Sequence, residues 1–230
     1  MDLLKHIIVP INKEGYPFIF IAAVASLVLG TIYSPLGWLS AVITCWMIYF
    51  FRDPDRITPL RPGLVIAPAD GVISKIERAL LPPEIAIDGK YRKRISIFLN
   101  IFNVHVNRVP VSGRISALNY YPGKFFNASL DKASAENERQ SVRVTNDEGE
   151  DIVFVQIAGL IARRIVCNLK DGQEVKAGER FGIIRFGSRM DIYLPEEINP
   201  LVIEGQQVIA GETVLADFGS SEGPRTGVRH

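Results

Sequence analysis

The sequence predicts a mainly β protein of the α+β class, with a helical hairpin at its N-terminus. Three observations support this prediction. No charged residue lies between Glu14 and Arg52, short β-rich runs follow from Leu64 onward, and two sequence patterns occur twice each within the β-rich part. The 230 residues suffice for one domain with an appendage and can bury a sizeable core.

The charge-free window contains two apolar runs, residues 17–33 and 36–51, separated by Ser34-Pro35. Each run is near the lower limit of roughly 17 residues for a membrane helix, and the proline interrupts helix at Ser34. We therefore expect a hairpin with both ends on one side of a membrane. The flanking basic residues place that side in the cytoplasm: Lys5, Lys13, Arg52 and Arg56.

Two other interpretations of the window are a buried hairpin in a soluble core and a cleaved signal peptide. The second fits poorly, because the apolar stretch is too long and no small-residue cleavage site follows its first half. We expect residues 1–58 to form the membrane-associated hairpin and residues 59–230 to form the β-rich catalytic or binding domain, with Pro59 and Pro62 stiffening the connection.

The second part of the chain alternates between β-rich runs and Gly, Pro or Asp-Gly turn signals. The expected strands are residues 71–76, 94–99, 104–109, 141–145, 152–157, 183–186 and 190–194. One helix is expected over residues 159–166.

Two internal repeats refine the fold prediction. Residues 68–74 and 110–116 share the pattern Pro-x-x-Gly-x-Ile-Ser, and residues 172–179 and 205–212 share Gly-x-x-Val-x-Ala-Gly-Glu. The second pattern is typical of a tight turn whose glycines adopt positive φ. This order of motifs resembles that of biotinyl and lipoyl domains. The resemblance implies a flattened β-barrel or sandwich built from two interleaved half-motifs.

Composition excludes several classes of function. A formal net charge of +1 gives no basis for a nucleic-acid partner. Two distant cysteines argue against a disulfide scaffold or a thiolate metal cluster, and three histidines leave little for a histidine-based metal site, so we expect no metal. No P-loop, dinucleotide fingerprint or Gly-x-Ser-x-Gly elbow is present.

Three places carry candidate chemistry. His105 lies in an alternating run in which Asn103, His105 and Asn107 would share a polar strand face, although a structural or surface histidine is an equally simple interpretation. Asp70 precedes a glycine, as many turn-forming aspartates do. Gly187-Ser188 sits between two expected strands, where a bulge or turn is the usual interpretation.

Several segments together resemble the phosphatidylserine decarboxylase family, in its short proenzyme form. They follow the hairpin in order: Tyr49-Phe50-Phe51-Arg52-Asp53-Pro54, Ala67-Pro68-Ala69-Asp70-Gly71, Phe102-Asn103-Val104-His105-Val106-Asn107-Arg108, Asn137-Glu138-Arg139 and Phe186-Gly187-Ser188-Arg189-Met190-Asp191. Each segment alone is a weak signal, but the ordered set covers most of the chain.

The resemblance implies a self-processing enzyme. Cleavage between Gly187 and Ser188 would give a β chain, residues 1–187, and an α chain, residues 188–230, which stay together as a heterodimer. Ser188 would become a pyruvoyl group, the covalent cofactor. That group would form a Schiff base with phosphatidylserine and release CO₂ and phosphatidylethanolamine. Another Gly-Ser pair ends at Ser220, but a polar tail follows it rather than a strand.

The resemblance also implies that Asp70, His105 and Ser188 act together, with His105 moving protons and Asp70 orienting it. Two positions depart from longer family members: Arg108 stands where they carry a second histidine, and Arg189 where they carry threonine. Side chains that could bind the anionic headgroup are Asn103, Asn107, Arg108, Lys124 and Arg139.

Two functions from other classes compete with this one. Leu130-Asp131-Lys132-Ala133 resembles the lipoylation site of a membrane-anchored carrier domain, but no clear β-hairpin surrounds it. A zinc peptidase on a similar barrel would lack ligands, because His105 is the only histidine between the hairpin and the terminal residue His230.

Overall fold

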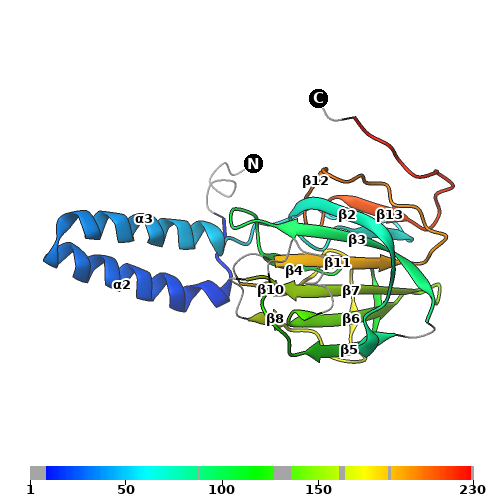
Figure 1. Ribbon diagram of the computed structural model, residues 1–230, viewed down its shortest axis with the longest axis horizontal. Helices are drawn as coiled ribbons and strands as arrows, with labels where there is room; N and C mark the ends of the chain where they lie inside the picture. Colours follow the sequence, from blue (N-terminus) through cyan, green and yellow to red (C-terminus); the bar gives the residue numbers. More distant parts are fainter. Residues whose placement is uncertain (1–8, 87–88, 127–135, 161–163, 186–187, 229–230) are drawn as a thin grey trace. The chain divides into compact units, whose positions relative to one another are not determined.

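The computed structural model describes residues 9–86, 89–126, 136–160, 164–185 and 188–228. The chain divides into two compact units, Met1–Asp55 and Arg56–His230. Helices make up most of the first unit, and strands make up the second (Figure 1). The mainly β fold with an N-terminal helical hairpin is therefore confirmed, whereas the domain boundary expected at residues 58 and 59 stays a prediction.

The first unit is a pair of helices joined by one extended residue. A short 3-10 helix, η1 (Lys13–Gly15), leads into α2 (Tyr16–Ile32), and α3 (Ser34–Phe50) follows. Tyr33 between them has φ −153° and ψ 110°. Pro35 lies in the first turn of α3, where its missing N–H costs nothing. The chain therefore turns at Tyr33, one residue before the break expected at Ser34.

Small and hydroxyl side chains bring the two helices together. A Cβ on Gly37 would lie 2.5 Å from the Cα of Gly30, so the backbones approach closely there. The hydroxyls of Ser26 and Thr44 lie 3.1 Å apart. Such contacts suit helix pairs in lipid, where burial from water does not drive association. By length and composition, Lys13–Ile32 is apolar enough to cross a membrane, and α3 is a shorter apolar helix.

The second unit consists of strands with one further 3-10 helix, η2 (Pro83–Ile85). Its strands are β1 (Leu64–Ile66), β2 (Gly71–Leu80), β3 (Tyr91–Leu99), β4 (Val106–Arg108), β5 (Gly113–Tyr121), β6 (Arg139–Thr145), β7 (Asp151–Ala158), β8 (Ile165–Cys167), β9 (Glu174–Val175), β10 (Arg180–Ile184), β11 (Ser188–Leu194), β12 (Gln207–Val208) and β13 (Val214–Asp217). Each run that the sequence predicts as a strand overlaps one of these strands, with at least one end shifted.

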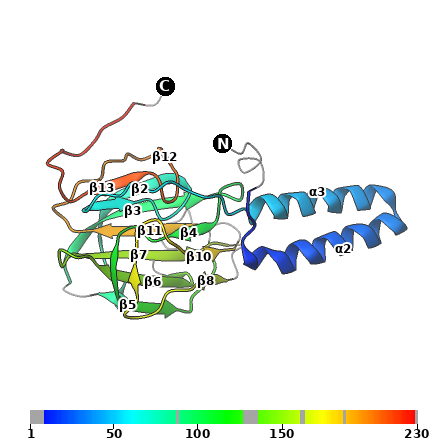
Figure 2. The same cartoon turned by 180° about the vertical axis from the view of Figure 1, so that it is seen from behind.

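Most of these strands form one antiparallel sheet in the order β12-β2-β3-β11-β7-β6-β5-β9. Both views show β3, β11, β7, β6 and β5 side by side in a single twisted layer (Figure 1, Figure 2). A smaller sheet, β4-β10-β8, and the pair β1-β13 complete the unit. The strand β11, which begins with Ser188, therefore lies in the middle of the large sheet.

The two faces of the large sheet bury different clusters. Alternate residues of β7 and β11, such as Phe154 and Ile192, point into the main core together with Val65 of β1 and Leu215 of β13. The intervening residues point to the opposite face, where a smaller cluster lies against Ile85 of η2. This period-two alternation is what the β-rich runs predict.

The two repeats pair crosswise and build two similar halves. Gly71 of the first Pro-x-x-Gly copy lies opposite Val208, and Gly113 of the second copy lies opposite Val175. The glycines that open and close the other repeat have φ between 74° and 86°: Gly172, Gly178, Gly205 and Gly211. The expected positive φ values and the interleaved half-motifs are thus confirmed.

The helix expected over residues 159–166 is wrong for the part that the structure describes. Ile165–Cys167 forms β8 and pairs with β10, with Val166 opposite Ile183. Residues 161–163 lie outside the described residues. Isoleucine and valine favour a pleated, half-buried surface, and the neighbouring strand β10 supplies one.

Candidate functional site

Several strands of the large sheet begin or end along the same border of the sheet, and the candidate site lies there. We call this border, which is formed by strand ends and not by an outermost strand, the edge of the sheet. Ser188, the first residue of β11, lies opposite Leu99, the last residue of β3, and opposite Ala158, the last residue of β7. Gly71 begins β2, which pairs with β3. Because neighbouring strands run in opposite directions, segments far apart in sequence meet at this edge.

Ser188 is completely buried at this edge. Its hydroxyl has no hydrogen-bond partner among the described residues. A buried polar group without a partner costs free energy, so such a group in a native protein calls for an explanation such as chemistry at that atom. Gly187, on the other side of the expected cleavage site, lies outside the described residues.

His105 is also completely buried, immediately before β4. The strand β4 pairs with β10, and β10 leads towards Ser188. The ring atom Nδ1 lies 3.0 Å from the carbonyl oxygen of Asn103. A carbonyl only accepts, so Nδ1 carries the hydrogen and the neutral ring has its basic lone pair on Nε2. The prediction of a polar strand face is wrong here: residues 100–103 turn, and the ring is enclosed.

Asp70 precedes β2, and its carboxylate accepts hydrogen bonds from distant segments of the chain. Arg56 donates to its Oδ2 at 2.8 Å, and the backbone N–H of Ala210 donates to its Oδ1 at 2.8 Å. In the other half of the fold, the Ser112 hydroxyl accepts a hydrogen bond from Ala177 N–H in the same way. Asp70 thus joins segments that are distant in sequence, and the ion pair with Arg56 was not predicted.

A hollow of about 190 Å³ opens beside Asp70. Asn100 and Asn103 line it from the turn that follows β3, and Gln207 lines it from β12. The same turn carries the carbonyl that orients His105. Asp70 therefore lines this hollow and His105 is hydrogen-bonded to the turn that lines it, but neither His105 nor Ser188 is among its described lining residues.

The residues expected to bind the headgroup separate into two sets. Asn103 lines the hollow. Asn107 is completely buried and accepts a hydrogen bond from Gln156 at 2.9 Å, and Arg108 donates to the Gly178 carbonyl at 2.8 Å. Both of these side chains are held within the protein, so their place in substrate binding stays a prediction.

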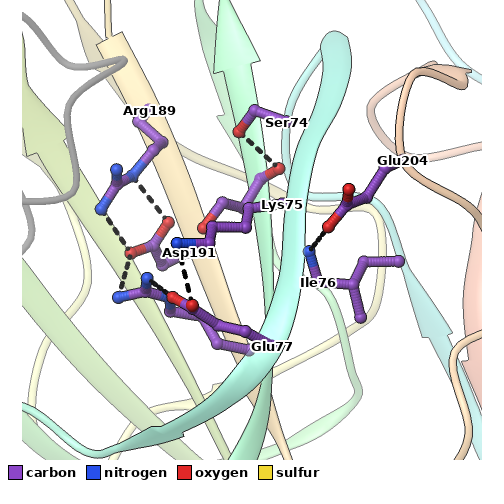
Figure 3. Close-up of polar contacts among 9 residues, drawn as sticks. Ser74, Lys75, Ile76, Glu77, Arg189, Asp191 and Glu204 are labelled. Atoms are coloured by element: carbon purple, nitrogen blue, oxygen red, sulfur yellow. Dashed lines mark hydrogen bonds and ion pairs between the residues drawn. The ribbon is translucent and has the colours of Figure 1, made fainter.

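A buried ion-pair cluster begins at Arg189, the residue after Ser188, and no sequence pattern predicted it. Arg189 Nε lies 2.9 Å from Asp191 Oδ1, and Arg94 NH1 lies 3.8 Å from Asp191 Oδ2. Arg94 also contacts Glu77, whose other oxygen lies 3.0 Å from Lys75 Nζ (Figure 3). These side chains anchor the residue that follows Ser188.

This cluster perturbs its titratable neighbours. Burial raises the pKa of the Tyr193 hydroxyl, and the adjacent Asp191 carboxylate raises it further. Burial alone would lower the pKa of the Arg94 guanidinium, but the charge of Asp191 leaves that pKa raised overall. Tyr193 is therefore neutral and Arg94 positively charged at neutral pH. Elsewhere, burial raises the pKa of the Cys167 thiol, consistent with a small core residue.

Asn137 and Arg139 form hydrogen bonds that hold the segment after β5 and the helix η2 against neighbouring strands. Asn137 is completely buried and donates to the Ala158 carbonyl at 2.7 Å and to the Phe126 carbonyl at 2.8 Å. Arg139 donates to both carboxylate oxygens of Glu84, at 2.6 and 2.8 Å. Although burial opposes it, the hydrogen bonds from Arg139 lower the pKa of Glu84. Asn137 thus has a structural place at the edge that sequence reasoning did not assign.

Comparison with known proteins identifies the family. The phosphatidylserine decarboxylase family model matches residues 43–216. A protein of Paramagnetospirillum magneticum named phosphatidylserine decarboxylase proenzyme is 58% identical over 227 residues, which cover 99% of this chain and 95% of that relative. A protein of the same name from Rickettsia felis is 60% identical over 218 residues, covering 95% of this chain and 93% of the relative.

The chain therefore belongs to the phosphatidylserine decarboxylase family and is a decarboxylase. Among the described residues, no group of three His, Cys, Asp or Glu side chains could hold a metal ion. The four-residue segment that resembles a lipoylation site, 130–133, lies outside the described residues.

Proposed function

We propose that this chain converts phosphatidylserine to phosphatidylethanolamine with a pyruvoyl group made from its own Ser188. The observation that carries the proposal is the buried Ser188 hydroxyl, without a partner among the described residues, at the start of β11. Family membership supplies the reaction class. The name proenzyme, borne by the relatives, supports cleavage of the chain.

The proposed self-cleavage begins when Ser188 Oγ attacks the carbonyl carbon of Gly187. The peptide bond is replaced by an ester, and the amine of Ser188 is set free. Loss of the Ser188 α-proton then breaks the ester, leaving a carboxylate on Gly187 and a dehydroalanine at position 188. Addition of water and loss of ammonia complete the pyruvoyl group. The products are residues 1–187 and residues 188–230, held as an α/β heterodimer.

His105 is the proposed proton carrier. Its Nδ1–H is held by the Asn103 carbonyl, so Nε2 is the atom that accepts a proton from the Ser188 hydroxyl and returns one later. A carboxylate often occupies the orienting position beside a catalytic histidine, and here a main-chain carbonyl lies there. Asp70, already paired with Arg56, would supply negative charge beside the hollow and support the protonated ring.

The residues at the edge fit a covalent carbonyl cofactor at position 188. Ser188 is enclosed, which would keep bulk water away, and β11 is fixed on both sides by β3 and β7. When formed, the pyruvoyl group would accept the electron pair that CO₂ leaves behind. The chain's own part is to position the substrate amine, with Asn103 contacting the headgroup, and to return a proton through His105.

The helical hairpin fits a lipid substrate. We propose that it anchors the enzyme in the cell membrane, with the catalytic domain of residues 59–230 on the cytoplasmic side. Lys13–Ile32 has the length and composition for this role. Basic residues flank the hairpin on both sides, which supports the orientation.

Denaturing electrophoresis and intact-mass measurement of the purified protein test the proposal. We expect a large fragment ending at Gly187 and a small one beginning with pyruvate. Ser188→Ala should stay whole and inactive. Ser220→Ala is the matched control: its exposed hydroxyl accepts a hydrogen bond from Glu222 N–H, and its removal should leave cleavage unchanged.

Three outcomes would contradict the proposal. An uncleaved wild-type chain with full decarboxylase activity would exclude the pyruvoyl mechanism. A block of cleavage by Ser220→Ala would move the site. A single chain carrying a lipoyl adduct on Lys132 would favour the carrier function instead.

A further inference from the structure

Exposed apolar side chains gather at the sheet edge that carries the candidate site. They come from three connections: the turn after β3, the segment after β5 and the segment after β7. We call them the apolar rim, and they are Ile101 (37% exposed), Phe102 (59%), Phe125 (38%), Phe126 (38%) and Leu160 (66%). Ile101 and Phe102 follow Leu99, and Leu160 follows Ala158. Phe126 is held by hydrogen bonds to Asn137, whose amide also donates to the Ala158 carbonyl.

The opposite ends of the same strands look different. There, β2 ends at Leu80 and β3 begins at Tyr91, and charged residues gather in a hollow of about 610 Å³ between them and the start of β7. That hollow is lined by Lys90, Arg92, Glu150, Asp151, Glu196 and Glu197, with Tyr91, Gly149 and Pro195. An Arg78 guanidinium lies over the Tyr91 ring. Leu80 and Tyr91 are also exposed at that end (51% and 50%), but the hollow that Tyr91 lines consists mainly of charged residues.

Basic side chains flank the apolar rim. Lys124, with 67% of its side chain exposed, precedes Phe125, and its Nζ lies 5.4 Å from the Phe126 ring centroid and 3.0 Å from Glu136. Arg164 is exposed and precedes β8, and its carbonyl oxygen accepts a hydrogen bond from the backbone N–H of Arg185. Aromatic and aliphatic side chains bordered by lysine and arginine are the composition that binds membrane interfaces, most strongly those with anionic lipids.

We propose that the apolar rim docks on the surface of a phospholipid bilayer that contains anionic lipid, and so brings lipid headgroups to the edge where Ser188 lies. This inference rests on the proposed function, because a diacyl phospholipid substrate resides in a membrane and is not dissolved in water. It adds to the hairpin a second contact, made by the catalytic unit itself. The hairpin would hold the enzyme at the membrane, and the rim would orient the site towards the headgroups.

A pair of full-length variants separates docking from catalysis. The rim variant carries Phe102→Ser and Leu160→Ser. The matched control carries Leu60→Ser and Leu80→Ser, at two exposed leucines (90% and 51%) outside the rim. Each is assayed on phosphatidylserine in phosphatidylcholine vesicles, and on short-chain phosphatidylserine below the concentration at which it forms micelles.

We expect the rim variant to lose roughly tenfold in kcat/KM on vesicles, because binding scales with the apolar area buried at the interface. Its activity on the monomeric substrate and its self-cleavage should match those of the wild type. The control variant should match the wild type on both substrates. Equal vesicle activity for the two variants would overturn the proposal. An equal loss on both substrates would also overturn it, by assigning the rim to the substrate pocket.

A measurement without turnover keeps this test independent of the proposed function. In a Cys45→Ser, Cys167→Ser background, Leu160→Cys or Leu80→Cys is labelled with a polarity-sensitive fluorophore. Vesicles containing phosphatidylserine should shift the emission to shorter wavelength at position 160 and leave it unchanged at position 80. No shift at position 160 would overturn the proposal. A shift in a protein without decarboxylase activity would support docking while contradicting the proposed function.

Discussion

Replacing Asp191 by asparagine tests whether the buried ion pairs fix the start of β11. The carboxylate is completely buried and faces two guanidinium groups, Arg189 at 2.9 Å and Arg94 at 3.8 Å. Asparagine keeps the size and an oxygen acceptor but removes the charge. Arg189 and Arg94 would then lose the buried counter-ion that they share, while Arg94 keeps its contact with the partly exposed Glu77.

The expected cost follows from this geometry. Opposite unit charges about 4 Å apart attract by about 4 kcal/mol at an effective dielectric constant of about 20. Breaking a buried pair by removing one partner typically costs 3–5 kcal/mol, because the remaining charge stays buried. We therefore expect Asp191→Asn to lower the free energy of unfolding by about 3–5 kcal/mol. Glu77→Gln, at a side chain that is 30% exposed, should cost about 1 kcal/mol or less.

Urea unfolding followed by far-ultraviolet circular dichroism measures both variants. A Ser188→Ala parent keeps the chain in one piece, so the unfolding midpoint does not depend on protein concentration. With Ser188 restored, Asp191→Asn should also cleave itself more slowly than Glu77→Gln, because Arg189 has lost its anchor. A loss of stability below about 1 kcal/mol for Asp191→Asn would refute the reasoning, since that is the range of an exposed pair.

Two further predictions concern the same edge of the sheet. A Cβ on Gly71 would lie 2.3 Å from the Phe98 carbonyl oxygen, so Gly71→Ala should slow self-cleavage as followed on a denaturing gel. Gly223 has open space around it, so Gly223→Ala should leave the rate unchanged. Equal cleavage rates for the two variants would contradict the packing argument. The pKa of Glu84 is lowered from 4.5, so its stabilisation is present above that pH and lost as the pH falls through the lowered pKa. Acid unfolding of Glu84→Gln should therefore depend less steeply on pH below 4.5 than that of the wild type, and parallel curves would show that the Arg139 pair does not contribute.

Local signals account for the parts of the fold that the sequence predicted. A charge-free window with one proline defines the hairpin, and Pro35 indeed lies in the first turn of α3. Glycines that repeat at fixed positions mark turns, and Gly172 and Gly205 have the positive φ that this requires. Alternation within runs gives the strands. None of these signals depends on which strands become neighbours.

The parts that were missed depend on neighbours. Ile165 and Val166 fit a helix or a strand by themselves, and β10 decides between the two. His105 follows a turn that its own alternating pattern did not reveal. Arg94 and Asp191 meet only because β3 and β11 pair in a particular register. Candidate residues came from motif resemblance, whereas their partners, such as Arg56 for Asp70, could come only from the folded chain.

The strand order has a consequence for the lifetime of the severed protein. A cut before Ser188 would give a small piece containing β11, β12 and β13, which lie in the middle of the large sheet, beside β2 and beside β1. The strand β11 of the small piece is hydrogen-bonded on both sides to strands of the large piece, so the small piece does not simply lie on its surface. It could leave only if β3 and β7 parted from β11. The two pieces would then separate at the rate at which the whole unit unfolds. The lifetime of the complex would therefore be set by the unfolding rate of the unit and not by an equilibrium dissociation constant.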